Sequence, residues 1–311
     1  MIKKIESVLF FCLFFSGLLA QKIHMEFPYF AGKTYKFIIL QGDDKRTVCQ
    51  GDIPEDGKFT LTIPEEYKTY TGISQWLITN TKEGGGLDML IPGKDFSVSS
   101  KDPKPDQNNT IYVGNNMMKE MDSLYTQQNN IFLRYDAMQQ AKKVYPETDK
   151  NYKIFQQEIQ KQEKLYEVFQ NKLRKRVHYV GELIKIMNIP RGIGTKLSQS
   201  DSDRAENILE YIANDLQWEI LYTSGQWTNV IETWINIHTR VLKDSDKFAR
   251  DFEKITARIK SPVLYTDFAG RTAYFLKQQQ KENFIEKISA VVINSGKITQ
   301  YEGSLMVFGK K

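Results

Sequence analysis

The hydrophobic pattern changes its period once along the 311-residue chain, and this change constrains the fold more than any other feature. Residues 23–113 consist of short runs rich in β-branched and aromatic residues, separated by glycine, proline and aspartate. In the run KFTLTI, Phe59, Leu61 and Ile63 alternate with polar residues, as in a strand with one buried face. No helical pattern lies between these runs. They therefore predict an antiparallel sandwich or barrel-like sheet, because parallel neighbours need long crossover connections.

From Asn116 onward, apolar residues recur at the spacing of helices. The clearest run predicts an amphipathic helix of about 30 residues in an antiparallel pair or short coiled coil. Its apolar positions recur every seven residues, at Tyr152, Ile159, Tyr166, Leu173 and Val180. A loop containing a Gly-Ile-Gly turn follows. Further helices are expected over residues 203–222, 227–243, 245–259, 263–280 and 282–294, and no internal repeat stands out. The sequence thus predicts an α+β protein, with an antiparallel β-sandwich-like domain over residues 22–114 and an all-α helical domain over residues 115–311.

The N-terminus has the pattern of a secretory signal peptide. Lys3 and Lys4 precede an almost wholly apolar run, and this run ends at Ala20. The run is shorter than the roughly 20 residues that a membrane span requires. We therefore expect cleavage after Ala20, export to the periplasm or cell envelope, and no transmembrane segment after cleavage. Cys12 lies inside the apolar run rather than directly after it, so a lipoprotein is not expected.

Composition excludes several classes of protein. The hydrophobic fraction of 41% and charged fraction of 26% are those of a globular protein. A net charge of +5 is too small to indicate a nucleic-acid-binding protein. After signal cleavage Cys49 is the one remaining cysteine, which excludes an intramolecular disulfide and a dithiol redox centre. No motif for a cofactor or a metal is present, and none is expected to bind.

Four residues are candidates for a functional role. Cys49 lies in a predicted strand, where an inert buried thiol is the usual outcome. Lys45 and Arg46 are close enough in sequence to leave a reactive thiol as the alternative. Trp227, Trp234 and His238 fall on one helical stripe. Such a stripe is more often part of a core, and the alternative is an apolar ligand groove.

The order of segments resembles the N-terminal region of exported bacterial thioredoxin-like disulfide reductases and peroxiredoxin-related proteins. The similar parts are the signal peptide, IPEDGKFTL at residues 53–61, GLDMLIPGKDFSV at residues 86–98, TIYVGNN at residues 110–116 and the Gln/Glu/Lys-rich helices. In that family, a β-domain of unknown function and a helical region precede a catalytic thioredoxin domain with a W-C-x-x-C motif. This chain ends at Lys311, where that domain is expected to begin, so no catalytic residue can be transferred.

The resemblance implies a non-catalytic accessory or interaction module of the envelope that contacts a protein partner or a second copy of itself. Two alternatives stay open: an envelope protein that binds a ligand in an apolar groove at Trp227 and Trp234, and a truncated thioredoxin-family protein. An enzyme whose site is built from Tyr, Asp, Lys or Glu without a short motif also stays open.

Overall fold

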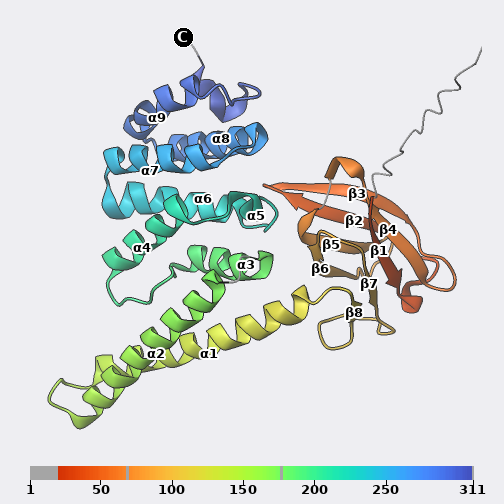
Figure 1. The fold of residues 1–311 in the computed structure, drawn as a ribbon, viewed down its shortest axis with the longest axis horizontal. Helices are drawn as coiled ribbons and strands as arrows, with labels where there is room; N and C mark the ends of the chain where they lie inside the picture. The colour runs from red at the N-terminus through yellow and green to blue at the C-terminus, as the bar shows by residue number, and fades with distance from the viewer. Residues whose placement is uncertain (1–19, 68–69, 176–177, 310–311) are drawn as a thin grey trace, which may run out of the picture.

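The computed structural model describes residues 20–67, 70–175 and 178–309. Residues 1–19 of the predicted signal peptide lie outside this part of the chain. In the described residues, two sheets built mostly from antiparallel strands precede a helical region (Figure 1). The predicted α+β class is therefore confirmed.

The strands of the described residues form two four-stranded sheets, ordered β4-β1-β7-β8 and β3-β2-β5-β6. In chain order they are β1 (Gln21–Glu26), β2 (Thr34–Gln41), β3 (Asp44–Asp52), β4 (Lys58–Ile63), β5 (Thr71–Thr79), β6 (Gly86–Pro92), β7 (Phe96–Ser99) and β8 (Ile111–Val113). One pairing differs from the antiparallel prediction, because β1 and β7 run parallel. This is possible since a long stretch of chain, containing the whole second sheet, connects the two strands.

Alternating side chains of these strands meet in an apolar core. In β1 every second residue is buried, beginning with Gln21 and Ile23, which is the pattern of a strand with one solvated face. Trp76 on β5 lies near the centre, with its ring centroid 4.6 Å from that of Phe27 and 5.6 Å from that of Phe30. Aromatic side chains therefore fill much of the space between the sheets.

The helical part begins at Met117, directly after the last strand. Its helices are α1 (Met117–Val144), α2 (Lys150–Arg174), α3 (Tyr179–Asn188), α4 (Asp201–Asn214), α5 (Trp218–Tyr222), α6 (Trp227–Asn236), α7 (Ser245–Arg258), α8 (Pro262–Gln278) and α9 (Glu282–Asn294). A π-helical segment, η4 (Ile237–Leu242), continues α6, and short 3₁₀ segments lie at Ile189–Arg191 and Gly303–Phe308.

The long helix predicted up to Val180 is shorter in the structure. α2 ends at Arg174, and His178 caps a new helix by accepting a hydrogen bond from the Gly181 N–H. The seven-residue apolar repeat thus crosses a helix boundary, because Val180 packs in the core from α3. Likewise, residues 203–222 form two helices, α4 and α5, instead of one.

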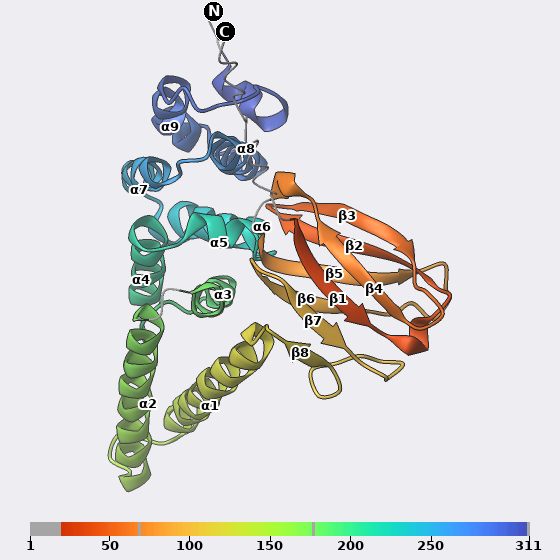
Figure 2. The ribbon, with the colours of Figure 1, turned by 45° about the vertical axis from the view of Figure 1, so that its right-hand side comes forward.

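Successive helices stack as antiparallel pairs in two rows. Figures 1 and 2 show α1, α3, α6 and α8 in the row nearer the sheets, and α2, α4, α7 and α9 in the row farther from them. Within the pairs, α1 contacts α2 and α8 contacts α9. Along the rows, α1 contacts α3, α6 contacts α8, α4 contacts α7 and α7 contacts α9. This arrangement is that of an α-solenoid. It places α4 and α7 on the face of the helical part that points away from the sandwich.

The sandwich and the helical part are joined by hydrogen bonds as well as by the chain. The Ile73 N–H donates to the carbonyl oxygen of Thr223 at 3.0 Å, and the Thr223 hydroxyl donates to the carbonyl oxygen of Thr71 at 2.8 Å. An ion pair between Asp43 and Arg271 adds a second point of contact. In the described residues, no helix combines the length and the hydrophobicity that a membrane span needs.

Candidate functional site

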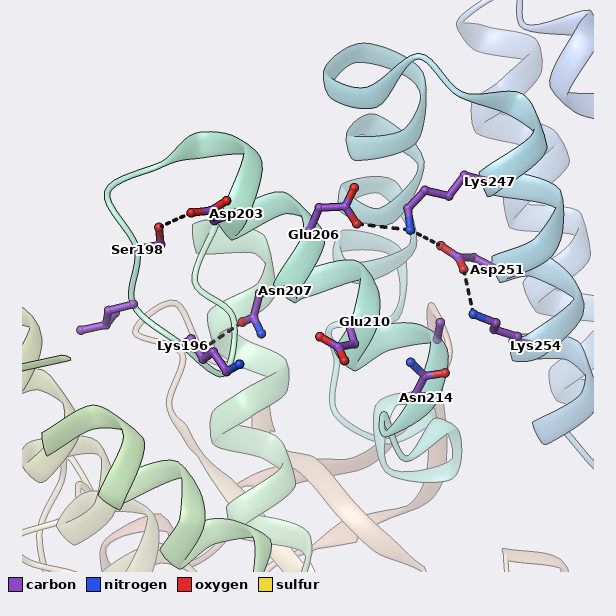
Figure 3. A pocket seen from close by; sticks show the side chains of 12 residues that line it. Lys196, Ser198, Asp203, Glu206, Asn207, Glu210, Asn214, Lys247, Asp251 and Lys254 are labelled. Atoms are coloured by element: carbon purple, nitrogen blue, oxygen red, sulfur yellow. Dashed lines mark hydrogen bonds and ion pairs between the residues drawn. The ribbon is translucent and has the colours of Figure 1, made fainter. Parts of the chain in front are cut away.

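The outer face of α4 carries a row of polar side chains. Asp203, Glu206, Asn207 and Glu210 recur at three- and four-residue steps, so they lie on one side of the helix. Ser200 begins the helix by accepting a hydrogen bond from the Asp203 N–H. Together with Lys196 to Ser198 and α7, this row lines a cavity of about 700 Å³, which we call the α4–α7 groove (Figure 3).

Charges of both signs face each other across the α4–α7 groove. Lys247 Nζ on α7 lies 3.2 Å from a carboxylate oxygen of Glu206 and 3.8 Å from one of Asp251. Lys254 Nζ lies 3.7 Å from the other oxygen of Asp251. Glu210, in contrast, has no ion-pair or hydrogen-bond partner among the described residues (Figure 3). Asp203 also lacks an ion-pair partner, but its carboxylate accepts a hydrogen bond from the Ser198 hydroxyl. Among the described residues, the groove therefore offers one carboxylate with no polar partner, Glu210, beside a chain of paired charges.

A buried histidine supports the floor of this groove. His238 lies in the π-helical segment η4 and is fully buried, with Nε2 3.4 Å from Asp251. Burial raises the pKa of Asp251, but its interactions with His238, Lys247 and Lys254 outweigh burial and leave that pKa below its ordinary value. Asp251 is thus held as a carboxylate beneath the groove. π-Helical turns are rare and are often associated with functional sites.

A second cavity of about 280 Å³ lies between α2, α3 and α4, and we call it the α3 cavity. Three ionisable groups line it although each is nearly inaccessible: Glu182, Lys185 and Tyr211 are 5%, 6% and 3% exposed. Lys185 forms an ion pair with Glu182, and the Tyr211 hydroxyl donates to the other Glu182 oxygen at 2.9 Å. Burial, followed by the charge of Glu182, raises the pKa of Tyr211 well above its ordinary value, so this hydroxyl stays protonated.

The loop after α3 is fixed against α4 and separates the two cavities. Asn207 Oδ1 accepts a hydrogen bond from the Lys196 N–H at 3.0 Å. A Cβ at Gly194 would overlap the Asn207 side-chain oxygen, so any larger residue there would have to displace this side chain and its hydrogen bonds. The carbonyl oxygen of Gly194 also accepts a hydrogen bond from the buried Tyr166 hydroxyl at 2.8 Å. The Gly-Ile-Gly segment predicted to be a plain turn therefore anchors a wall of both cavities.

No family model, curated protein or solved structure matches this chain. The chemistry of the two cavities therefore has to follow from their own residues. Within residues 20–67, 70–175 and 178–309, no group of three or more His, Cys, Asp or Glu side chains is arranged to hold a metal ion. The carboxylates of the α4–α7 groove are instead placed to meet cationic groups, and the α3 cavity holds both a cation and an anion.

The structure separates the four residues singled out in the sequence from both cavities. Cys49 lies half-buried on β3, and burial raises the pKa of its thiol despite a partly offsetting backbone hydrogen bond at Thr62. A thiol with a raised pKa is a poor nucleophile. Trp227 and Trp234 are fully buried in the helical core, so neither ring lines an open groove. His238 is also buried, and contacts the α4–α7 groove only through Asp251.

Sequence reasoning did not identify the residues that line the cavities. Glu182 and Lys185 resemble an ordinary surface pair three positions apart, and Tyr211 resembles a core aromatic. One signal was available: Asp203, Glu206 and Glu210 form an acidic stripe at helical spacing, opposite a lysine-bearing helix. That both stripes face one cavity follows only from the stacking of α4 on α7.

Proposed function

We propose that this protein is a non-catalytic interaction module that binds a basic polypeptide segment in the α4–α7 groove. The observation that carries the proposal is the unpaired Glu210 carboxylate in a cavity where Glu206 and Asp251 are already neutralised by lysines. Asp203 and Glu210 lie on the groove wall outside any ion pair, and Lys196 is the one lining cation outside an ion pair among the described residues, so the balance of these charges is negative. A Lys- or Arg-bearing partner segment matches this charge.

The architecture supports a binding role. Stacked helix pairs present extended surfaces, and proteins built this way commonly use them for binding other chains. Hydrogen bonds at the joint between sandwich and helices connect the helical part to the rest of the molecule. As the sequence suggests, we place the protein outside the cytoplasm and relate it to the N-terminal region of thioredoxin-like envelope reductases. Its half-buried Cys49, with a raised pKa, is unsuited to redox turnover.

An array of sequence-diverse peptides tests the proposal. Mature wild-type protein is expected to bind peptides enriched in Lys and Arg, and the charge reversal Glu210→Lys is expected to abolish this preference. Glu219→Lys, an exposed change outside both cavities, is the matched control and is expected to bind as wild type does. A preference for uncharged or acidic peptides would refute the groove as the binding surface. Binding of basic peptides by Glu210→Lys as tightly as by wild type would refute it too.

Dithiol-dependent insulin reduction and peroxide consumption test the non-catalytic part separately. Turnover by the mature protein above that of a Cys49→Ser variant would show that the thiol is catalytic and would overturn the proposal.

A further inference from the structure

The α3 cavity contains more hydrogen-bonding capacity than its own residues satisfy. Lys185 has three N–H donors, and within the described structure its one hydrogen-bond acceptor is Glu182. The face of the Tyr211 ring lies 5.3 Å from Lys185 Nζ and supplies a further, weaker contact. A buried ammonium group is costly unless its donors are satisfied, so the remaining donors favour an acceptor inside the cavity.

Gln170 provides an independent observation at the same place. It lies on α2, lines the cavity and is 1% exposed. The Tyr166 hydroxyl is near enough to interact with it, yet neither polar atom of the carboxamide has a partner in good hydrogen-bond geometry among the described groups. Buried polar side chains without a protein partner are uncommon, and a bound water or ligand is the usual explanation for one. The Gln170 carboxamide has two N–H donors and an oxygen with two lone pairs, and the neighbouring Tyr166 hydroxyl can meet only part of this capacity.

The rim of the cavity carries both signs of charge. Arg174 and Lys196 contribute cations, whereas Glu210 and Asp215 contribute carboxylates. The buried Glu182–Lys185 pair is neutral overall, so the cavity has no net preference for an anion or for a cation. A molecule that carries one group of each sign matches this distribution better than a singly charged one.

We propose that the α3 cavity binds a small zwitterion of the α-amino-acid class. Its carboxylate accepts hydrogen bonds from Lys185 and Gln170, and its ammonium group faces the carboxylates of Glu210 and Asp215. A volume of about 280 Å³ lies at the lower end of ligand pockets and suits a molecule of this size. The site is distinct from the polypeptide-binding role proposed above, although Lys196, Asn207 and Glu210 border both cavities.

Binding is tested with each of the twenty standard L-α-amino acids as a separate probe, by saturation-transfer NMR and calorimetry on the mature chain. At least one amino acid is expected to bind, and its N-acetyl and carboxamide derivatives, which each lack one charge, are expected to bind at least about tenfold more weakly. No binding by any amino acid at about 10 mM, or equal binding of the derivatives, would overturn the proposal.

Variants locate the site. The double variant Glu182→Gln/Lys185→Met removes the buried pair without leaving an unpaired charge, and is expected to weaken binding about tenfold or more. Asp215→Asn acts at the rim, where no change in folding is expected, and weakens binding through the ammonium group. Glu219→Gln is the control. If Asp215→Asn and the folded double variant both bind as wild type does, the site is elsewhere. If the double variant does not fold, the affinities of Arg174→Gln and Asp215→Asn test the site instead, and wild-type affinity in both places the site elsewhere.

A failure of the amino-acid proposal can be distinguished from a failure of the polypeptide proposal. Glu206→Lys changes only the α4–α7 groove and is expected to leave amino-acid affinity unchanged while it weakens basic-peptide binding. Amino-acid binding that is lost in Glu206→Lys but kept in Asp215→Asn would contradict the assignment to the α3 cavity.

Discussion

Two parts of the helical region make a useful comparison: the aromatic cluster around Trp234 and the polar face of α4. In the cluster, the centroid of the Trp234 ring lies 4.7 Å from that of Phe248 and 5.7 Å from that of Phe268, and all three side chains are buried. On α4, short polar side chains border two cavities. The difference teaches that in this protein large aromatic residues fill the core, whereas ordinary charged residues line the cavities in which we propose that ligands bind.

The largest effect on stability is expected from the aromatic cluster. Trp234→Ala removes a fully buried ring and leaves a cavity, which costs about 3–5 kcal/mol of unfolding free energy. Urea unfolding followed by circular dichroism measures this cost. Under conditions where the variant stays folded, peptide and amino-acid affinities should equal those of wild type. A specific loss of either affinity would show that the aromatic stripe has a binding role after all.

The Glu182–Lys185 pair sharpens the comparison, because it is as buried as the aromatic cluster but charged. Lys185→Met alone leaves the Glu182 carboxylate buried without its cation and is expected to cost about 3–5 kcal/mol. Glu182→Gln/Lys185→Met should recover most of that loss, as measured by the same urea titrations. If the double variant is no more stable than the single one, the pair contributes packing rather than charge compensation.

An intermediate effect, dependent on pH, is expected at Asp251. Its folded-state pKa is below the ordinary value of about 3.9, so the carboxylate stabilises the fold above that value. The contribution is lost as the pH falls through the lowered folded-state pKa. Asp251→Asn should therefore be less stable than wild type by about 1–3 kcal/mol at pH 7.

The difference between Asp251→Asn and wild type should shrink in urea titrations carried out from pH 5 down to pH 2. A difference that is constant over this range would contradict the ion-pair account of Asp251. Lys287→Gln, which removes an exposed ion pair with Asp246, is the control for general effects of charge.

The smallest effect is expected at Cys49. Cys49→Ser should change the unfolding free energy by about 1 kcal/mol or less, since the side chain is only half-buried. Because burial raises the thiol pKa, alkylation by iodoacetamide should be slower than that of a free cysteine at pH 7. Mass spectrometry over time measures the rate. Alkylation faster than that of free cysteine would revive Cys49 as a reactive group.

Local patterns in the sequence predicted the elements of the fold well. Alternation in KFTLTI placed β4, because this pattern depends on neighbouring residues only. The parallel pairing of β1 with β7 could not be predicted, since it depends on how the second sheet folds between them. The helix boundary at His178 was missed because Val180 continues the seven-residue repeat from a different helix.

The candidate site was beyond sequence reasoning for a related physical reason. A pair such as Glu182 and Lys185 has the same sequence pattern whether it is exposed or buried, and only the packing of α2 and α4 against α3 removes it from water. Gly194 gave a misleading signal, because it suggested a flexible turn. The close contact that disfavours a side chain at Gly194 is with Asn207 on the next helix, which the local sequence pattern does not reveal.

Binding of a basic peptide to the face of α4 is the central claim, and one titration tests it most directly. The tightest-binding peptide from the array, labelled with fluorescein, is titrated with wild type, Glu210→Lys and Glu219→Lys, and its anisotropy is recorded. The account predicts an affinity at least about tenfold weaker for Glu210→Lys and unchanged for Glu219→Lys. Equal affinities for all three proteins would contradict it.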